Sequence, residues 1–133
     1  MILPVTAVFA SVCVLLLIVL SYRVATFRLK HRKGLGVNDD RDFEVAVRTQ
    51  ANLAEYAPIT LVLLAIGELN GVSVAWIYGL GMAFVVGRLL HAWGMVKGRG
   101  GPHKARLVGI VLTWLAMLVL AVAVLLNVFL FSA

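Results

Sequence analysis

Long stretches without a charged residue constrain this chain more than any other feature. Residues 1–22, 69–87 and 107–133 contain no Asp, Glu, Lys or Arg, and each stretch is long enough to cross about 30 Å of hydrocarbon as a helix. A fourth apolar stretch runs through residues 56–67. With 62% hydrophobic residues, 14% charged residues and a mean hydropathy of +1.02, the chain is too apolar for a soluble domain. We therefore predict an all-α integral membrane protein, a four-transmembrane-helix bundle forming a single membrane domain over residues 1–133.

The basic residues indicate how these helices are oriented in the membrane. All twelve Lys and Arg residues lie in two sectors, residues 23–48 and 88–106, which flank the first and third connections. The second connection, residues 68–72, has none. The positive-inside rule then predicts that loops one and three are cytoplasmic and that both termini face the opposite side. Because the basic stretch follows the first apolar run, we interpret that run as a retained helix and not as a cleaved signal peptide.

Composition also argues against several classes of function. The basic residues lie at helix ends without interleaved aromatic residues, so a nucleic-acid partner is not expected. The three histidines lack the spacing of a zinc site, and a metal is not expected either. Cys13 is the one cysteine, which leaves no partner for an intramolecular disulfide.

Turn-forming residues divide the chain into elements. We predict helices over residues 4–27, 42–69, 73–96 and 102–131, with Asp40 or Asp42 capping the second helix and Pro102 in the first turn of the fourth. Small residues on the third helix predict close contacts with neighbouring helices. These are Gly79, Gly81, Ala83 and Gly87.

A polar stripe on the second helix is the main candidate for a functional site. Asn52, Glu55 and Tyr56 follow Arg48 by four, seven and eight residues, which places them at about 40°, −20° and 80° from Arg48 around a helix. An arginine, an amide, a carboxylate and a phenol therefore share one face. Ionisable groups at membrane depth cost about 2.5–3.5 kcal/mol each, so they are a functional-site hypothesis by default.

Polar groups on two other helices lie toward the same basic end. Arg88 and His91 are three residues apart on the third helix, and Arg106 lies in the fourth. Several arginines with a carboxylate and an amide suit an anionic ligand that also carries an amine, because arginine binds carboxylates in bidentate fashion. A peptide-like molecule fits this pattern better than a plain lipid. The alternative is structural, with Arg48 and Glu55 neutralising each other to fix helix packing.

Gln50 indicates an oligomer. It lies two residues after Arg48, about 200° around the helix, so the second helix is polar on two sides. An oligomer in which Arg48 faces one site and Gln50 faces the neighbour's site accommodates both sides.

The polar stripe belongs to a pattern that resembles a known family. The segment contains Phe43-Glu44 followed by Arg48-x-Gln50-x-Asn52-x-x-Glu55-Tyr56-x-Pro58. This resembles the signature of the MAPEG family, the membrane-associated proteins in eicosanoid and glutathione metabolism. It is most similar to the branch of leukotriene C4 synthase and the five-lipoxygenase-activating protein, and to the microsomal glutathione transferases. The four short spans, the basic first loop, the arginine in the third helix and Ala105-Arg106-Leu107 extend the resemblance over nearly the whole chain.

The resemblance implies a homotrimer that holds glutathione as co-substrate at its subunit interfaces, near the cytoplasmic side. It assigns glutathione binding from one subunit to the polar stripe and to two positions on the third helix, and from the neighbour to two further residues. The stripe residues are Arg48, Asn52, Glu55 and Tyr56, the third-helix positions are Arg88 and His91, and the neighbour's residues are Arg28 and Gln50. Arg106 matches the arginine that stabilises the glutathione thiolate. His91 and Met95 stand where relatives with well-defined glutathione sites carry tyrosines.

The implied activity is that of a glutathione transferase or peroxidase acting on lipophilic electrophiles or peroxides dissolved in the bilayer. The alternative is a non-catalytic MAPEG-like scaffold that binds lipid or another thiol. A small multidrug transporter also has four spans, but it requires an acidic residue in its first helix, and residues 1–22 contain none. The compact loops favour a bacterial inner-membrane protein.

Overall fold

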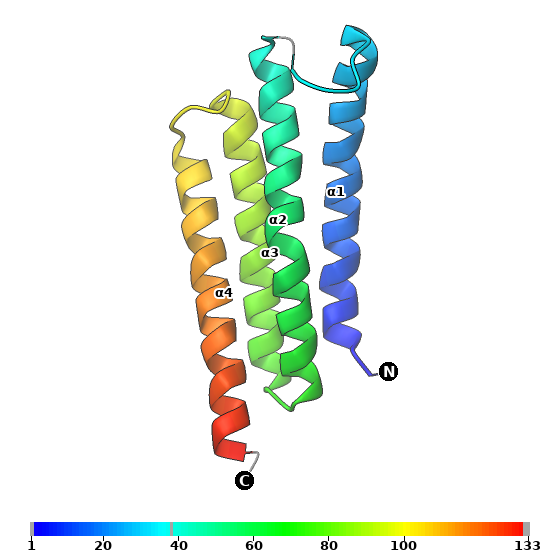
Figure 1. Ribbon diagram of the computed structural model, residues 1–133. Coiled ribbons are helices and arrows are strands. Elements are labelled where there is room, and N and C mark those ends of the chain that lie inside the picture. The colour runs from blue at the N-terminus through cyan, green and yellow to red at the C-terminus, as the bar shows by residue number, and fades with distance from the viewer. Residues whose placement is uncertain (1, 38, 132–133) are drawn as a thin grey trace.

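The computed structural model describes residues 2–37 and 39–131, which form four helices joined by short loops (Figure 1). The helices are α1 (Pro4–His31), α2 (Arg41–Leu69), α3 (Val74–Lys97) and α4 (Lys104–Phe131). All four are long and apolar enough to cross a membrane, which confirms the predicted all-α integral membrane bundle. Met1, Asn38, Ser132 and Ala133 of the predicted domain lie outside the described residues.

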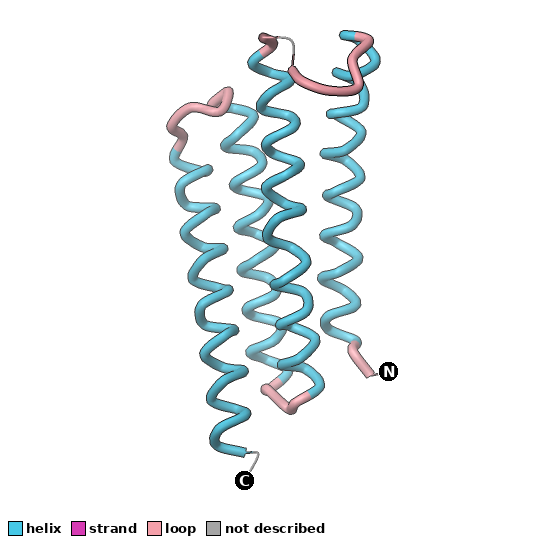
Figure 2. The backbone as a smooth tube through the Cα atoms, in the orientation of Figure 1, coloured by secondary structure: helices cyan, strands magenta, loops and turns pink. Residues whose placement is uncertain are grey.

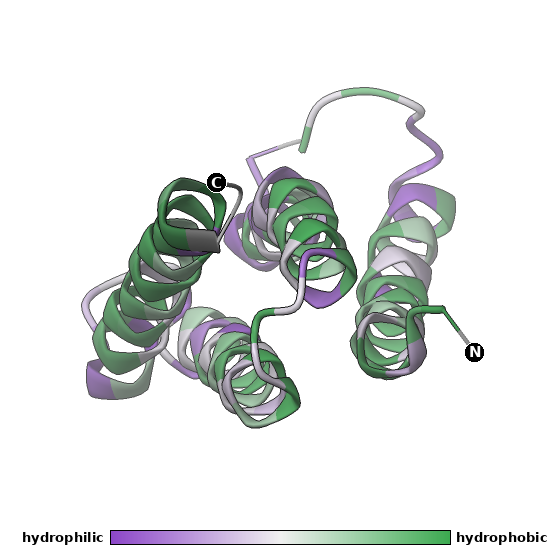
Figure 3. Cartoon of the chain, turned by 90° about the horizontal axis from the view of Figure 1, so that it is seen from below, coloured by the Kyte–Doolittle hydropathy of each residue, from purple (hydrophilic) through white to green (hydrophobic). Residues whose placement is uncertain are grey.

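The helices run up and down, so that the loops alternate between the two ends of the bundle. The α1–α2 and α3–α4 loops lie at one end, and the α2–α3 loop lies at the other end beside both ends of the chain (Figure 2). Seen along the helices, α2 and α3 occupy the middle, and α1 and α4 flank them (Figure 3). In the described part of the chain α1 and α4 make no contact. The basic residues of loops one and three therefore share one end, which we call the basic end.

Two predicted helix boundaries were wrong. α1 continues to His31 instead of ending at residue 27, and it ends where Arg32 adopts a left-handed conformation with φ 51°. α4 begins at Lys104, because the Nδ1 atom of His103 accepts a hydrogen bond from the backbone N–H of Ala105 at 3.2 Å. His103 thus caps the helix, and Pro102 lies before its first turn.

Of the two predicted caps of α2, Asp40 and Asp42, the structure has Asp40. Its Oδ1 accepts hydrogen bonds from the backbone N–H groups of Asp42 at 2.9 Å and Phe43 at 3.1 Å. These bonds satisfy two of the donors that a helix N-terminus leaves free. The Phe43 N–H, supported by His31 and Asp42, holds the pKa of the Asp40 carboxyl below its usual value of 3.8.

The cap of α1 comes from a different helix. Glu68, in the last turn of α2, accepts hydrogen bonds from the N–H groups of Val5 at 2.9 Å and Thr6 at 2.8 Å. It also accepts one from the Thr6 hydroxyl at 2.6 Å. Leu3, the residue at the cap position, makes no side-chain bond of this kind. The acid at the far end of α2 therefore fixes where α1 begins.

Glycines bring α3 and α4 into close contact. A Cβ atom at Gly94 would lie 2.3 Å from the backbone nitrogen of Arg106, and one at Gly109 would lie 2.4 Å from the backbone nitrogen of His91. A Cβ at Gly87 would lie 2.7 Å from the Thr113 hydroxyl. Such contacts leave no room for a side chain, as small-residue packing in membranes requires. The predicted role is confirmed for Gly87, and also for Gly81, which packs on Phe9 of α1, whereas Gly79 has open space around it.

Candidate functional site

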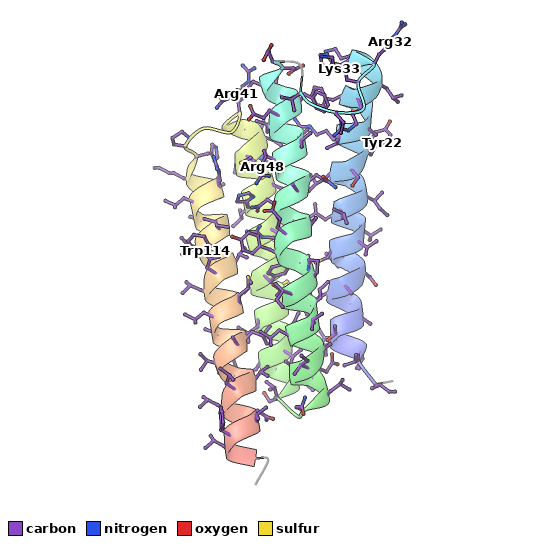
Figure 4. All side chains as sticks on the ribbon, viewed as in Figure 1. Tyr22, Arg32, Lys33, Arg41, Arg48 and Trp114 are labelled. Atoms are coloured by element: carbon purple, nitrogen blue, oxygen red, sulfur yellow. The ribbon has the colours of Figure 1, made fainter. Side chains whose placement is uncertain are left out.

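The polar stripe of α2 divides into an exposed part and a half-buried part. Arg48 and Glu55 form the exposed part, with Nη1 of Arg48 and Oε1 of Glu55 3.6 Å apart. Their side chains are 56% and 53% exposed, and Figure 4 labels Arg48 on the surface of α2. This distance is long for a charge-assisted hydrogen bond, and exposed pairs of this kind contribute little to stability. Both side chains can therefore take other partners at small cost.

Asn52 and Tyr56 form the half-buried part, and both contact Arg88 of α3. Nη1 of Arg88 donates a hydrogen bond to Oδ1 of Asn52 at 2.5 Å. The guanidinium carbon lies 5.0 Å from the centre of the Tyr56 ring and 6.0 Å from that of Phe84. A cation over aromatic faces is an attractive arrangement, more so where water is excluded.

Arg88 is held on its other side by α4. Nε and Nη2 of Arg88 donate to the hydroxyl oxygen of Thr113 at 3.0 and 2.6 Å. The Thr113 hydroxyl in turn donates to the carbonyl of Gly109 at 2.8 Å. Arg88 is only 2% exposed, and among the described residues no carboxylate forms an ion pair with it. Hydrogen bonds and ring faces alone accommodate its charge.

A second link joins α4 to the stripe. The indole N–H of Trp114 donates to the Tyr56 hydroxyl at 3.0 Å, although the Trp114 side chain lies on the outer surface of α4 (Figure 4). Neither Thr113 nor Trp114 is among the predicted site residues. A threonine seven residues after Arg106, hence on nearly the same face of an otherwise apolar helix, was the signal available.

Arg106 and Arg48 line one polar pocket at the basic end. The pocket has a volume of about 180 Å³ between α2, α3 and α4. Nη1 of Arg106 donates to the carbonyl oxygens of Gly100 at 2.6 Å and Gly101 at 3.3 Å, which holds the guanidinium against the α3–α4 loop. The residues that line the pocket are Arg41, Glu44, Val45, Arg48, Met95, Gly100 and Arg106.

Arg106 also lines a second, larger cavity. It has a volume of about 450 Å³ and lies on α4 and the loop before it. Its surface is mostly apolar, although basic residues are among those that line it. The residues that line it are Pro102, His103, Lys104, Arg106, Leu107 and Ile110. Arg106 therefore contributes to both a polar pocket and an apolar cavity.

Two of the nine predicted site residues, Arg48 and Arg106, line the polar pocket, and the other seven do not. Four of the seven belong to the stripe or contact it, and the remaining three lie elsewhere. His91 is buried between α3 and α4, with its backbone against Gly109. Gln50 lies toward α1, where its Nε2 is 3.5 Å from the Ser21 hydroxyl. Arg28 contacts the Phe43 ring at 5.5 Å and donates to the Gly34 carbonyl. That Gln50 and Arg28 reach a neighbour's site stays a prediction.

The described residues contain no group of three His, Cys, Asp or Glu side chains placed to hold a metal ion. The polar side chains that gather at and near the basic end are arginines, an amide and a few carboxylates. Arginine forks suit carboxylates, and a nearby carboxylate suits an ammonium. The arrangement at the basic end is therefore suited to a small zwitterionic or anionic organic ligand.

Comparison with known proteins gives the chain a family. The family model described as the MAPEG family matches residues 6–126. Inner membrane protein YecN of Escherichia coli K12 is 31% identical over 119 residues, which cover 90% of this chain and 88% of that protein. The protein of the same name from Escherichia coli O6:H1 matches with the same identity and coverage. The chain is therefore an integral membrane protein that belongs to the MAPEG family.

Proposed function

We propose that this protein is a glutathione-dependent transferase or peroxidase that acts on lipophilic electrophiles or peroxides dissolved in the membrane. The observation that carries the proposal is the position of Arg106, which lines both the polar pocket and the apolar cavity. A polar thiol ligand on one side and an apolar substrate on the other would meet at this guanidinium. In conjugation, the thiolate sulfur forms a bond to an electrophilic carbon, and the leaving group departs with the bonding electrons.

Arg106 is suited to hold the thiol in its anionic form. A cation about 4 Å from a sulfur atom, at an effective dielectric constant of about 20, favours the anion by roughly 4 kcal/mol before desolvation is subtracted. Lowering a thiol pKa from about 8.5 to about 6 requires only about 3.4 kcal/mol. One well-placed arginine is therefore sufficient, provided that its loop contacts at Gly100 and Gly101 keep it at the pocket wall.

The remaining charges of the pocket, together with Glu55 of the adjacent stripe, suit the two ends of glutathione. Arg41 and Arg48 offer guanidinium groups to its carboxylates, and Glu44 or Glu55 offers a carboxylate to its ammonium group. Arg48 and Glu55 are more than half exposed on a membrane helix, which is unfavourable unless water or another subunit covers them. A homotrimer, in which Gln50 and Arg28 of a neighbour complete the site, would cover them.

The basic end supports a cytoplasmic orientation of loops one and three. These loops carry the basic residues and share that end of the bundle, and under the positive-inside rule they would lie in the cytoplasm, where glutathione would be available. Both termini would then face the opposite compartment. The printed name of YecN, an inner membrane protein, supports the bacterial inner membrane as the location.

A non-catalytic scaffold is the second candidate. Arg48 pairs with Glu55 and Arg106 binds loop carbonyls within the chain itself, so each has a partner without any ligand. A protein that binds lipid in the apolar cavity needs no thiolate. In that case glutathione would not bind, or would bind without ionising.

Glutathione binding to the detergent-purified protein separates these two functions. We expect calorimetry to detect binding and ultraviolet absorbance to detect a bound thiolate at neutral pH, where free glutathione is mostly protonated. Binding without thiolate absorbance would favour the scaffold. Absence of any binding would overturn the proposal that glutathione is the ligand.

A further inference from the structure

The hydrogen bonds behind the stripe determine which atom of Asn52 faces outward. Arg88 has only N–H donors, so the amide atom that lies 2.5 Å from its Nη1 must be the oxygen. Chemistry fixes this orientation, because turning the amide over would place two donors against each other. The amide nitrogen Nδ2 must then face away from Arg88.

This Nδ2 is unpartnered and open. No described residue accepts a hydrogen bond from it, whereas every fully buried side-chain nitrogen and oxygen of the described residues has a partner. Asn52 is half-buried, so its free amide lies at the surface of α2. On the helix it stands between Arg48, one turn before it, and Glu55, one turn after it. The open donor of Asn52 thus lies next to the exposed part of the stripe.

Arg88 can orient Asn52 only if it is itself fixed, and Thr113 fixes it. The Thr113 hydroxyl accepts two hydrogen bonds from Arg88 and donates one to Gly109. A hydroxyl has one donor and two acceptor positions, so all its capacity is used. The Cβ of an alanine at Gly87 would reach the same hydroxyl. The Thr113 hydroxyl is therefore packed against α3 and also bonded within α4.

We propose that Thr113 is a positioning residue that acts through Arg88 to present the Asn52 amide as a hydrogen-bond donor. The exposed surface of α2 between Arg48 and Glu55 is thereby made selective for a ligand that offers a carboxylate or an amide carbonyl at this point. The inference rests on the proposed function, since glutathione is the acceptor-rich ligand in question. It adds a residue of α4, in the apolar part of the bundle, to the determinants of specificity.

Asn52→Asp is the sharpest test. The aspartate keeps the size of the side chain and gives the buried Arg88 a counter-ion, so we expect thermal unfolding at the same temperature or higher. Its outward atom becomes an acceptor, which repels a ligand carboxylate. We expect glutathione to bind about tenfold more weakly or worse, because one charge-assisted hydrogen bond is lost. A role in packing alone would not lower affinity while preserving stability.

Thr113→Val and Thr113→Ser form a matched pair. Valine keeps the shape but removes the hydroxyl, and we expect weaker glutathione binding and a higher KM with a smaller change in kcat. Serine keeps the hydroxyl, and we expect it to restore binding close to that of the wild type. Equal losses in the two variants would show that the hydroxyl is not responsible and would overturn the proposal.

The outcomes also distinguish this proposal from the function on which it rests. If the wild type binds glutathione and Asn52→Asp binds it equally well, the positioning role is wrong and the proposed function stands. If the wild type does not bind glutathione, the proposed function fails and the inference fails with it.

Discussion

Arg88 and Arg48 are the same residue type near the same stripe, and they have opposite environments. Arg88 is 2% exposed and forms three hydrogen bonds across α2, α3 and α4. Arg48 is 56% exposed and lies 3.6 Å from its partner carboxylate. A buried arginine whose contacts are already satisfied serves the fold, whereas an exposed arginine with a weak partner can be used by a ligand. The comparison separates an arginine that is held within the bundle from one whose guanidinium is available to a ligand.

The largest effect that tests this comparison is on stability. Arg88→Ala should lower the free energy of unfolding by about 3 kcal/mol or more, because it leaves a cavity and strips Asn52 and Thr113 of a partner. Arg48→Ala should change it by less than about 1 kcal/mol, as for other exposed ion pairs. Thermal unfolding in detergent measures both. Equal losses would mean that the two arginines do not differ in this way.

Arg106→Ala should affect chemistry and leave folding intact. Loss of the cation beside the thiolate should lower kcat/KM toward a chlorinated nitrobenzene by about 100-fold, the size expected for one electrostatic contact in a transition state. Arg99→Ala, which removes an exposed guanidinium that bonds Asp42 in the first turn of α2, is the matched control. Full activity in Arg106→Ala would show that it does not stabilise the thiolate.

Glu55→Gln should have a smaller effect, confined to binding. The change removes the charge that would attract the ammonium group of glutathione and keeps the size of the side chain. We expect glutathione affinity to fall roughly fivefold, equivalent to about 1 kcal/mol, with no change in unfolding temperature. Calorimetry on the purified variant measures the affinity. An unchanged affinity would remove Glu55 from the site and return it to a role in pairing with Arg48.

The smallest effect concerns the cap of α2, at the basic end. The Asp40 carboxyl has a pKa below its usual 3.8 in the folded protein. Its contribution to stability is therefore complete above the usual pKa of 3.8. It is lost as the pH falls through the lowered pKa. Asp40→Asn keeps a capping oxygen without a titrating group, and should make unfolding less dependent on pH below about 4. Identical pH profiles would show that the cap does not titrate.

Much of the fold could be predicted from the sequence, for reasons that involve only local composition. The uncharged runs predict the spans because hydrocarbon excludes charge, and Asp40 predicts the start of α2. The C-terminal end of α1 and the start of α4 were less predictable. α1 continues through a basic segment, and His103 caps α4 through a ring nitrogen. The cap on α1 could not be predicted at all. Glu68 is 62 residues from Thr6 in the sequence, and only the folded bundle brings the two together.

The sequence alone determined that this chain spans a membrane, that its basic loops share one end, and that α2 carries Arg48, Asn52, Glu55 and Tyr56 on one face, because helix periodicity and hydrophobicity are local properties. Only the tertiary structure decided that the stripe divides between an exposed pair and a half-buried pair that contacts Arg88. That division depends on where Arg88 and Thr113 lie on α3 and α4, and close glycine contacts between those helices set their position. Hydrogen-bond direction then decides which atom of Asn52 faces outward, since a guanidinium can only donate.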